Sequence, residues 1–426
     1  MKIALIEPLG DLGIGTYVHE LAEALTDEGV EVDVYSADRA ETTSWPRKHR
    51  FFPVLGSALI RQRAQLSSRA TPAVPADNAA GSVAASRPLH TISSQPPIVE
   101  PSERFPRFRH WPVLRDTYIS CELAAWLRTR NYDLVWTHWP RMGRPLVTFW
   151  QAARLLGLRV VHTAHNVLPH EVQKGDYEEF KSVYRHSALI VTHSEMASSS
   201  LREFFPAFAQ KVTTSRLGLF TTYPPQPGAR EAFRREANVP DDSTIVLAFG
   251  SVRPYKNNEL LLQTMLADSA RDFTLVIAGH EFGMPGVDPT DPLAMTRRRV
   301  AELGLSERVR LLPGPVPNAR ASFLFEAADI VALPYTESYG SAVLLLAMSF
   351  GKCIVATRTG GMDEHLRGYP AGTIIELTAG PEELLRELRA ARETVRERKT
   401  PPSRPPELEW PAIVRRLLPD LERAAR

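Results

Sequence analysis

The sequence predicts an α/β protein built from two doubly wound parallel sheets. Short apolar runs alternate with longer amphipathic runs along most of the chain, and strands that alternate with helices in this way form parallel sheets. The chain has 426 residues, more than a single hydrophobic core usually holds, so we expect two domains. A proline-rich segment at 224–227 marks the linker between them. We therefore expect a first domain at 1–223, a second at 224–405 and a terminal helix at 406–426.

Composition excludes several classes of protein. A net charge of +2 argues against a general nucleic-acid binder, which carries a strong positive excess. Cys121 and Cys353 are the only cysteines and lie in different halves, so neither a disulfide framework nor a thiolate metal site is expected. The N-terminus has no signal-peptide pattern, and no long apolar run occurs that would span a bilayer. We therefore expect a cytoplasmic protein in a reducing compartment.

The first domain begins with a strand, a glycine-rich loop and a helix. Lys2–Glu7 is a short apolar run, glycines recur through 10–15, and 16–25 is amphipathic. Gly13 and Gly15 lie in this loop. The loop is either part of a ligand site or a tight turn that lets the helix pack on the sheet.

The same alternation predicts the other elements of the first domain: strands at 30–35, 134–137, 158–163, 188–192 and 212–214, and helices at 117–128 and 145–156. His138 follows one of these strands. The segment 162–171, which contains His165 and Asn166, ends another and holds three histidines and a glutamate. Their spacing does not place the four on one helical face, and Pro169 prevents a helix there, so we expect no metal.

Between about 40 and 115 the pattern breaks, with prolines scattered among serine and alanine. A stretch of this length is usually a functional lid or a disordered loop. Its flanks, 45–63 and 104–115, mix basic and aromatic residues. Three interpretations remain open for them: a solvated loop, contact with an anionic membrane surface at the inner face, or contact with an anionic, ring-bearing acceptor.

The second domain begins with a strand at 244–249, followed by a loop with Arg253 and Lys256 and a helix at 259–265. Two cations in a loop beside the N-terminus of a helix suit a diphosphate, although a pair of surface charges is the alternative. Gly279 follows the next strand, 273–278. Further elements are strands at 309–312 and 353–356 and helices at 293–303, 319–328, 381–399 and 408–425.

The segment around Glu337 organises this domain. A strand at 330–333 leads into a loop, and Gly340 and Ser341 open a helix at 342–350. The free N–H groups at the start of that helix form a site for an anion such as a diphosphate. Glu337 stands at the carboxyl end of the strand, where open α/β sheets bind ligands, and can accept hydrogen bonds from sugar hydroxyls. The alternative is a structural turn whose glutamate is solvated.

Three segments together resemble the retaining glycosyltransferases of the GT-B fold, in the family 4 group. They are 333–341 with Thr359–Glu364 after it, the run His165–Glu171, and 250–257 with its Arg-Pro-Tyr-Lys sequence. The resemblance covers nearly the whole chain apart from 40–115. It implies two Rossmann-like domains that face a cleft, with the C-terminal helix crossing back to the first domain.

The resemblance also implies roles for individual residues. Glu337 would face the donor sugar, and His165 would donate a hydrogen bond to the sugar or to the leaving diphosphate. The donor diphosphate would lie against Arg253, Lys256, Gly340 and Ser341. Other residues would line the cleft: Ser338, Tyr339 and Gly279 on the donor side, and Gly13, Gly15, His138 and Asn166 on the acceptor side.

The chain departs from the family pattern at two places. Members carry a second glutamate eight residues after the first, where it faces the ribose, but Leu345 stands here, or Leu346 if the segment is aligned on its Ala-Met pair. A leucine cannot accept a ribose hydrogen bond. Ser251 also stands where members have an arginine, and Arg253 is displaced from that place by two positions.

The reaction implied is transfer of a sugar from a nucleotide-sugar, UDP- or GDP-linked, to a polysaccharide, lipid-linked or small-molecule acceptor, with retention, without a metal or other cofactor and without nucleic acid. The leaving diphosphate would act as the base in a front-face mechanism. A second hypothesis is a non-catalytic paralogue that binds a sugar nucleotide or lipid, motivated by the missing glutamate. A dinucleotide-dependent oxidoreductase rests only on the first glycine loop.

Overall fold

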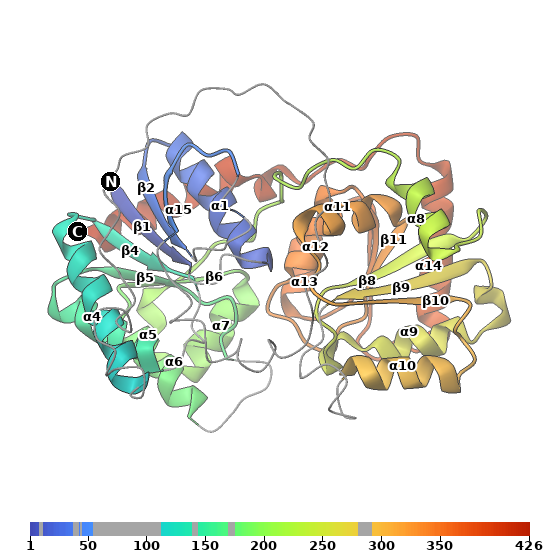
Figure 1. Cartoon of the computed structure of the whole chain (residues 1–426), viewed down its shortest axis with the longest axis horizontal. Helices are drawn as coiled ribbons and strands as arrows, with labels where there is room; N and C mark the ends of the chain where they lie inside the picture. Colours follow the sequence, from blue (N-terminus) through green and yellow to red (C-terminus); the bar gives the residue numbers. More distant parts are fainter. Residues whose placement is uncertain are drawn as a thin grey trace, which may run out of the picture.

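The computed structural model describes residues 1–7, 12–36, 42, 45–53, 112–138, 144–168, 175–279 and 292–426. These residues form two lobes, each with a central sheet flanked by helices (Figure 1). The predicted insertion at 40–115 lies mostly outside the described residues.

The first lobe contains a seven-stranded sheet in which every pair of neighbours is parallel. The strand order is β3-β2-β1-β4-β5-β6-β7. The strands are β1 (Lys2–Glu7), β2 (Glu31–Ser36), β3 (Arg50–Pro53), β4 (Leu134–Thr137), β5 (Val160–Thr163), β6 (Leu189–Thr192) and β7 (Val212–Thr214).

Helices cover both faces of this sheet. They are α1 (Leu12–Asp27), α4 (Pro112–Thr129), α5 (Arg144–Leu155), α6 (Asp176–His186) and α7 (Glu195–Phe204). The alternation of side chains along β1 explains the two faces: Ile3 packs in one core with Tyr17 of α1, whereas Ala4 packs in the other with Trp150 of α5. The sheet is therefore doubly wound, as predicted.

The second lobe contains a six-stranded sheet, also parallel throughout, in the order β10-β9-β8-β11-β12-β13. Its strands are β8 (Thr244–Phe249), β9 (Phe273–Gly279), β10 (Val309–Pro313), β11 (Ile330–Leu333), β12 (Cys353–Thr357) and β13 (Gly372–Ile375). Its helices are α8 (Ala229–Ala237), α9 (Asn258–Met265), α10 (Pro292–Glu302), α11 (Asn318–Ala327), α12 (Ala342–Ser349), α13 (Gly360–Leu366) and α14 (Pro381–Glu397).

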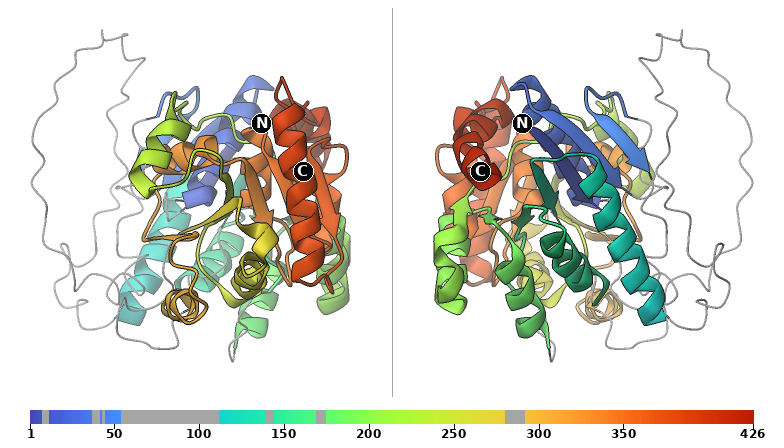
Figure 2. Two further views of the ribbon diagram at one scale, coloured as in Figure 1. Left: turned by 90° about the vertical axis from the view of Figure 1, so that its right-hand side faces the viewer. Right: turned by 90° about the vertical axis from the view of Figure 1, so that its left-hand side faces the viewer.

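The last helix, α15 (Trp410–Ala425), returns to the first lobe. The red end of the chain lies beside β1 and α1 in Figure 1 and in the right-hand view of Figure 2. The ring of Trp410 lies 5.4 Å from that of Tyr17, and Arg415 Nε donates to Glu28 over 2.8 Å. A Cβ on Gly218 would lie 2.4 Å from the Trp410 ring, so only glycine fits beneath it. The predicted crossover helix is confirmed.

Two local expectations differ from the structure. The first helix begins at Leu12 rather than at 16, so Gly13 and Gly15 lie inside α1 and not in a loop before it. The second difference is β3, which lies within the stretch where no regular structure was expected and pairs with β2. Its sequence, Arg-Phe-Phe-Pro, is too short to show an apolar pattern.

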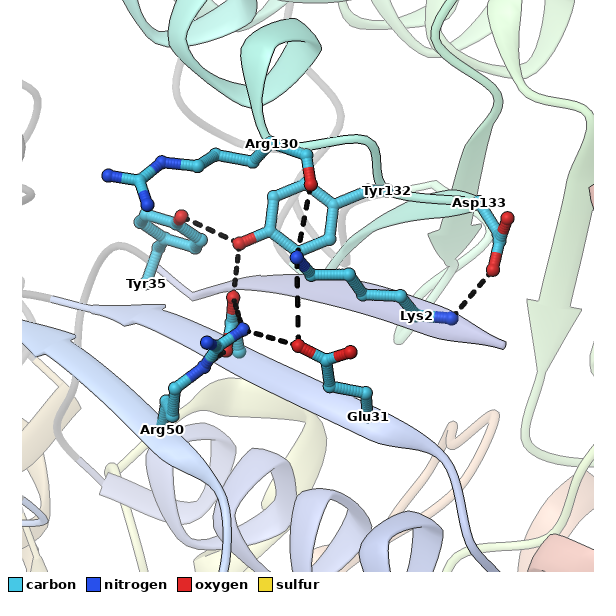
Figure 3. A network of polar contacts seen from close by, with 8 residues as sticks. Lys2, Glu31, Tyr35, Arg50, Arg130, Tyr132 and Asp133 are labelled. Atoms are coloured by element: carbon cyan, nitrogen blue, oxygen red, sulfur yellow. Dashed lines mark hydrogen bonds and ion pairs between the residues drawn. The ribbon is translucent and has the colours of Figure 1, made fainter. Parts of the chain in front are cut away.

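A polar network binds the arginine at the start of β3 to the neighbouring strand (Figure 3). Arg50 of β3 donates from Nε to the buried carboxylate of Asp33 over 2.5 Å and from a second nitrogen to Glu31. The hydroxyl of Tyr132 also donates to Asp33. These bonds satisfy a carboxylate that would otherwise be costly to bury, and they tie β2 and β3 to the segment before β4.

Candidate functional site

The strand order alone indicates where each sheet would bind a ligand. In the first sheet β1 lies between β2 and β4, and in the second β8 lies between β9 and β11. The order reverses at these points, and open α/β sheets bind ligands there, beyond the carboxyl ends of the strands. His138 follows β4, Lys256 follows β8 and Glu337 follows β11. The fold therefore gathers these predicted residues at the two reversal points.

Lys256 is buried with its ammonium at the carboxyl end of β8. Its Nζ donates a hydrogen bond of 2.7 Å to the carbonyl oxygen of Phe249 and lies 5.6 Å from the centre of the Tyr335 ring. Burial, and then the nearby charge of Arg253, lower the pKa of Lys256 to about 7. An anion that arrives here would favour the charged form of the lysine.

Gly250 shows that this ammonium and the start of α12 share one small space. A Cβ on Gly250 would lie 2.7 Å from Lys256 Nζ and 3.5 Å from Val343 Cγ2, and its φ of 91° also favours glycine. Lys256, Gly250 and Tyr335 line the same small cavity. The structure thus brings the predicted cation and the predicted helix N-terminus together.

The loop that carries Glu337 is fastened to the loop that carries Lys256. The backbone N–H of Thr336 donates to the carbonyl oxygen of Tyr255 over 2.8 Å, and the rings of Tyr255 and Tyr335 meet edge to face. Glu337 is exposed. Burial raises the pKa of the Tyr339 hydroxyl, and the negative charge of Glu337 raises it further, so the two side chains are close.

Ser341 is the N-cap of α12. Its hydroxyl oxygen accepts a hydrogen bond of 3.2 Å from the N–H of Leu344, which satisfies one of the free donors at the helix start. Ser338 and Ser341 are buried, whereas Tyr339 and Gly340 are half-buried. Capping leaves the N–H groups of Ala342 and Val343 as the donors that an anion could take.

Gly279 has a structural role that sequence reasoning missed. A Cβ at this position would lie 2.1 Å from the carbonyl oxygen of Gly250, because β9 and the loop after β8 approach each other here. This close approach accounts for the glycine. Its predicted place on the donor side of the cleft stays a prediction.

In the first lobe the predicted histidines lie side by side. His138 is fully buried, and its ring lies 6.1 Å from that of His165. Burial, and then the neighbouring histidines, hold the pKa of His138 and of His165 well below the usual value. Nδ1 of His165 lies 3.0 Å from Nε2 of His193. Asn166 is half-buried beside them.

Two residues of this cluster were not predicted as site residues. His193 follows β6 as His138 follows β4, and the ring of Tyr17 on α1 lies 5.3 Å from His165, 5.3 Å from His193 and 5.6 Å from His138. The carboxyl ends of neighbouring parallel strands meet at one edge of a sheet. A histidine directly after a third strand was therefore the available signal for His193; no such signal marks Tyr17.

Gly13 lies where the two lobes meet. A Cβ on Gly13 would lie 3.7 Å from the Cβ of Ala342, so the first turns of α1 and α12 adjoin. Gly15 instead lines a small cavity on the first lobe, together with Glu7, His19 and Ser36. The structure therefore separates the two glycines: only Gly13 faces the second lobe.

Two further contacts join the lobes near the site. The hydroxyl of Ser194 donates to the carbonyl oxygen of Tyr339 over 2.7 Å. The carboxylate of Glu364 accepts from the N–H groups of Glu195 and Met196 at 2.8 and 2.9 Å, so a residue of α13 caps α7 in the other lobe. The loop of the predicted donor site is thus held against the first lobe.

A separate pocket of about 450 Å³ also lies between the lobes and contains none of the predicted site residues. Three arginines and three glutamates line it, Arg216, Arg367, Arg416, Glu195, Glu364 and Glu407, along with parts of α15. Its charges balance formally. It gives an alternative location against which the predicted site can be tested.

Leu345 and Leu346 are both buried in the core, so neither position offers a ribose a polar group. The basic side chains of 45–53 are used within the fold: Lys48 pairs with Asp27, and Arg47 lies over the Phe51 ring. The remainder of 45–63, the segment 104–111 and the residues His170 and Glu171 lie outside the described residues.

Within the described ranges, no group of three histidine, cysteine or acidic side chains is placed to hold a metal ion. In the same ranges, no helix combines the length and the apolar character needed to cross a bilayer.

Two family models match this chain. Residues 13–218 match the model described as Glycosyltransferase Family 4, and residues 229–399 match the one described as Glycosyl transferases group 1. The two matches fall on the two lobes.

Among curated proteins, the chain is 28% identical over 268 residues to the D-inositol 3-phosphate glycosyltransferase of Salinispora tropica, which covers 58% of this chain and 54% of that protein. The protein of the same name from Thermobifida fusca is 28% identical over 264 residues, or 58% of each chain. The chain therefore spans a little more than half the length of these relatives.

Among solved structures, Anabaena HepE in complex with UDP and glucose superposes with a TM-score of 0.64 at 16% identity, over 99% of this chain and 100% of that one. Sucrose-phosphate synthase from Thermosynechococcus elongatus superposes with a TM-score of 0.63 at 17% identity, over 99% and 98%. Likeness at such low identity shows that the fold is shared.

Proposed function

We propose that this chain, which belongs to the GT-B glycosyltransferases that join a family 4 domain to a group 1 domain, transfers a sugar from a nucleotide-sugar to an acceptor. The family resemblance expected from three segments is confirmed by the matches to both models. The observation that carries the proposed reaction is the buried ammonium of Lys256 beside the first turn of α12.

Charge explains how this arrangement would promote the reaction. Breaking the bond between sugar and phosphate develops negative charge on the diphosphate and positive charge on the sugar. Lys256, Arg253 and the N–H groups at the start of α12 would stabilise the diphosphate in fixed positions, an effect of about 3 kcal/mol per well-placed donor. The proposal needs no metal, because these cations and amides supply the compensating charge.

We assign Glu337 to the donor sugar. A carboxylate beside a diphosphate would repel it, so its use is to accept hydrogen bonds from sugar hydroxyls and to favour the positive charge that develops on the ring. We further propose retention by front-face attack, in which the leaving phosphate takes the proton of the acceptor hydroxyl. Glu337 then orients the sugar and does not form a bond to it.

The donor we propose is a nucleoside diphosphate sugar, with UDP-glucose as the first compound to test, because HepE was solved in complex with UDP-glucose. The acceptor would bind the first domain. The candidate acceptors are polysaccharides, lipid-linked sugars and small metabolites. Phosphorylated cyclitols are added to these candidates because the curated relatives are named for D-inositol 3-phosphate. Contact of 45–63 and 104–115 with an anionic membrane surface at the cytoplasmic face stays a prediction.

A thermal-shift screen with UDP-, GDP-, ADP- and TDP-sugars tests the donor, because a ligand that binds the folded state raises its apparent stability. A donor that stabilises the protein is then incubated with the acceptor panel, and release of the nucleotide is measured. Stabilisation by one class of nucleotide-sugar with turnover supports the proposal. Absence of any shift across the panel contradicts it.

The buried leucines at 345 and 346 favour one rival, a paralogue that binds a sugar nucleotide without transferring the sugar. The same assay separates the two. Binding with no turnover or hydrolysis under any acceptor would support the rival.

A further inference from the structure

Two histidines at the ends of neighbouring strands form a hydrogen-bond chain with a defined direction. Nδ1 of His193 lies 3.1 Å from the carbonyl oxygen of Ser215, and Nε2 of His193 lies 3.0 Å from Nδ1 of His165. Nε2 of His165 is buried and has no hydrogen-bond partner among the described residues.

The direction follows from the chemistry of the groups. A carbonyl oxygen can only accept, so His193 must carry its proton on Nδ1 and donate to Ser215. A neutral imidazole has one N–H, which leaves Nε2 of His193 as an acceptor. His165 must then donate from its own Nδ1, and its Nε2 is left with a bare lone pair.

Both rings are neutral at neutral pH. Burial lowers the pKa of His193 to about 4, although its bond to Ser215 opposes the shift. Burial also holds the pKa of His165 well below its usual value, and the neighbouring His193 contributes in the same direction. A single proton per ring is therefore the state on which the direction depends.

His193, the first histidine of this hydrogen-bond chain, lies beside the predicted donor loop. A Cβ on Gly340 would lie 3.7 Å from the Cβ of His193, and Ser194 binds the carbonyl oxygen of Tyr339. A sugar held between Glu337 and the start of α12 would therefore lie near His193, which is hydrogen-bonded to His165.

We propose that His193 is a positioning residue that holds His165 in the tautomer with an unprotonated Nε2, so that the site selects a substrate that offers a hydroxyl there and rejects one that offers a carboxylate. This inference rests on the proposed glycosyl transfer. It reverses the direction expected from the sequence, in which His165 was the donor.

Selectivity follows because a hydroxyl can donate to the lone pair, whereas an ionised carboxylate has only lone pairs of its own. A buried acceptor without a donor is costly, so the correct substrate removes that cost and a carboxylate adds repulsion to it. A UDP-hexose and the matching UDP-hexuronic acid differ in this one group and are suitable probes.

Nitrogen NMR of histidine-labelled protein without ligand tests the tautomer directly, and it does not depend on activity. We expect His165 to be protonated on Nδ1 and bare on Nε2 near neutral pH. Protonation on Nε2 would overturn the proposal even if the protein proves to be an active glycosyltransferase.

Three variants test the consequence for the substrate. His193→Leu removes the chain, whereas His193→Gln offers an amide that can still donate to Ser215 and accept from His165. His186→Leu is the matched control, because His186 makes a similar bond of 2.7 Å from Nδ1 to the carbonyl oxygen of Ser182 at the end of α6. Each variant is assayed for kcat/KM with both UDP-sugars.

We expect His193→Leu to lower kcat/KM for the hexose by roughly 10- to 100-fold and to reduce the preference over the hexuronic acid, because His165 is then free to change tautomer. His193→Gln and His186→Leu should retain most of the kcat/KM for the hexose and most of the preference over the hexuronic acid. If His193→Leu lowers kcat/KM by the same factor for both sugars, the role of His193 is purely structural and the proposal is overturned. The same holds if His193→Gln loses as much kcat/KM as His193→Leu. If the wild type uses a hexose linked to another nucleotide, the same comparison is made with that nucleotide; if it uses no nucleotide-sugar at all, the proposed function fails, and the NMR result still decides the tautomer.

Discussion

The backbone N–H of Thr336 donates a 2.8 Å hydrogen bond to the carbonyl oxygen of Tyr255, and this bond ties the loop after β11 to the loop after β8. Glu337 and Lys256 each lie one residue beyond these partners. Two residues separated widely in the sequence, one acidic and one basic, are thereby held at a single edge of the second sheet. The account of the reaction depends on that arrangement.

Replacing Glu337 tests the role assigned to its carboxylate. We expect Glu337→Gln to lower the transfer rate by roughly 100- to 1,000-fold, because a preorganised charge at the donor sugar is lost. The residue is exposed, so the free energy of unfolding should change by no more than about 0.5 kcal/mol. Glu382→Ala, at an exposed position in the first turn of α14, is the control. Wild-type turnover in Glu337→Gln would remove the residue from the mechanism.

The binding of UDP should depend on pH through Lys256. Its pKa is about 7 in the free protein, and a bound diphosphate raises it, so binding above that pH takes up a proton. Affinity should therefore be insensitive to Lys256 below about pH 7 and fall as the pH rises above it. Calorimetry in buffers of different ionisation enthalpy measures the proton uptake.

Lys256→Met is the comparison for that experiment. It should weaken UDP binding by about 2 kcal/mol or more and abolish the uptake. Equal proton uptake by wild type and variant would show that another group is responsible.

The buried histidines of the first lobe should make the protein sensitive to acid. Burial depresses the pKa of His162 to about 3 and of His193 to about 4, below the value near 6.5 of an unfolded chain. Between those values the unfolded chain binds protons that the native state does not, so stability falls as the pH falls, by about 1.4 kcal/mol per unit for each histidine.

Urea unfolding at several pH values between about 7 and 5 measures this slope. His162→Phe should reduce the slope of the unfolding free energy against pH by the contribution of one histidine. An unchanged slope in this variant would mean that His162 is not the titrating group.

Glu364 should stabilise the contact between the lobes. Glu364→Ala leaves the N–H groups of Glu195 and Met196 without their cap, and we expect a loss of about 1 kcal/mol in the free energy of unfolding. Glu364→Gln keeps one acceptor oxygen and should lose less. Identical stability of Glu364→Ala and wild type would show that this contact does not contribute.

Much of the fold was predictable because the strands of both sheets carry their own signal. The apolar runs at β1, β4, β8 and β11 are bounded by turn or polar residues, so their limits in the structure match the sequence closely. β3 was not predictable, because an edge strand with arginine at its start depends on Asp33 of another strand for its charge balance. The start of α1 was misplaced because glycines disfavour helix; in the structure Gly13 lies against α12, whereas Gly15 lines a small cavity on the first lobe.

The grouping of the candidate residues at the ends of neighbouring strands was predictable, but the protonation and contacts of their side chains were not. Histidines after neighbouring strands indicate a shared edge, yet the tautomer of His165 depends on the carbonyl oxygen of Ser215, which no spacing reveals. Gly279 shows the same limit. The sequence cannot distinguish a glycine that contacts a ligand from one that allows two backbone segments to approach, and here the close neighbour is the carbonyl group of Gly250.

A crystal structure of the protein with UDP and a non-transferable sugar analogue tests the central claim most directly. We predict that the diphosphate lies within hydrogen-bond distance of Lys256 Nζ and of the N–H groups of Ala342 and Val343, with the sugar against Glu337. A diphosphate bound in the pocket lined by Arg216, Arg367 and Arg416, with the loop after β8 empty, would contradict it.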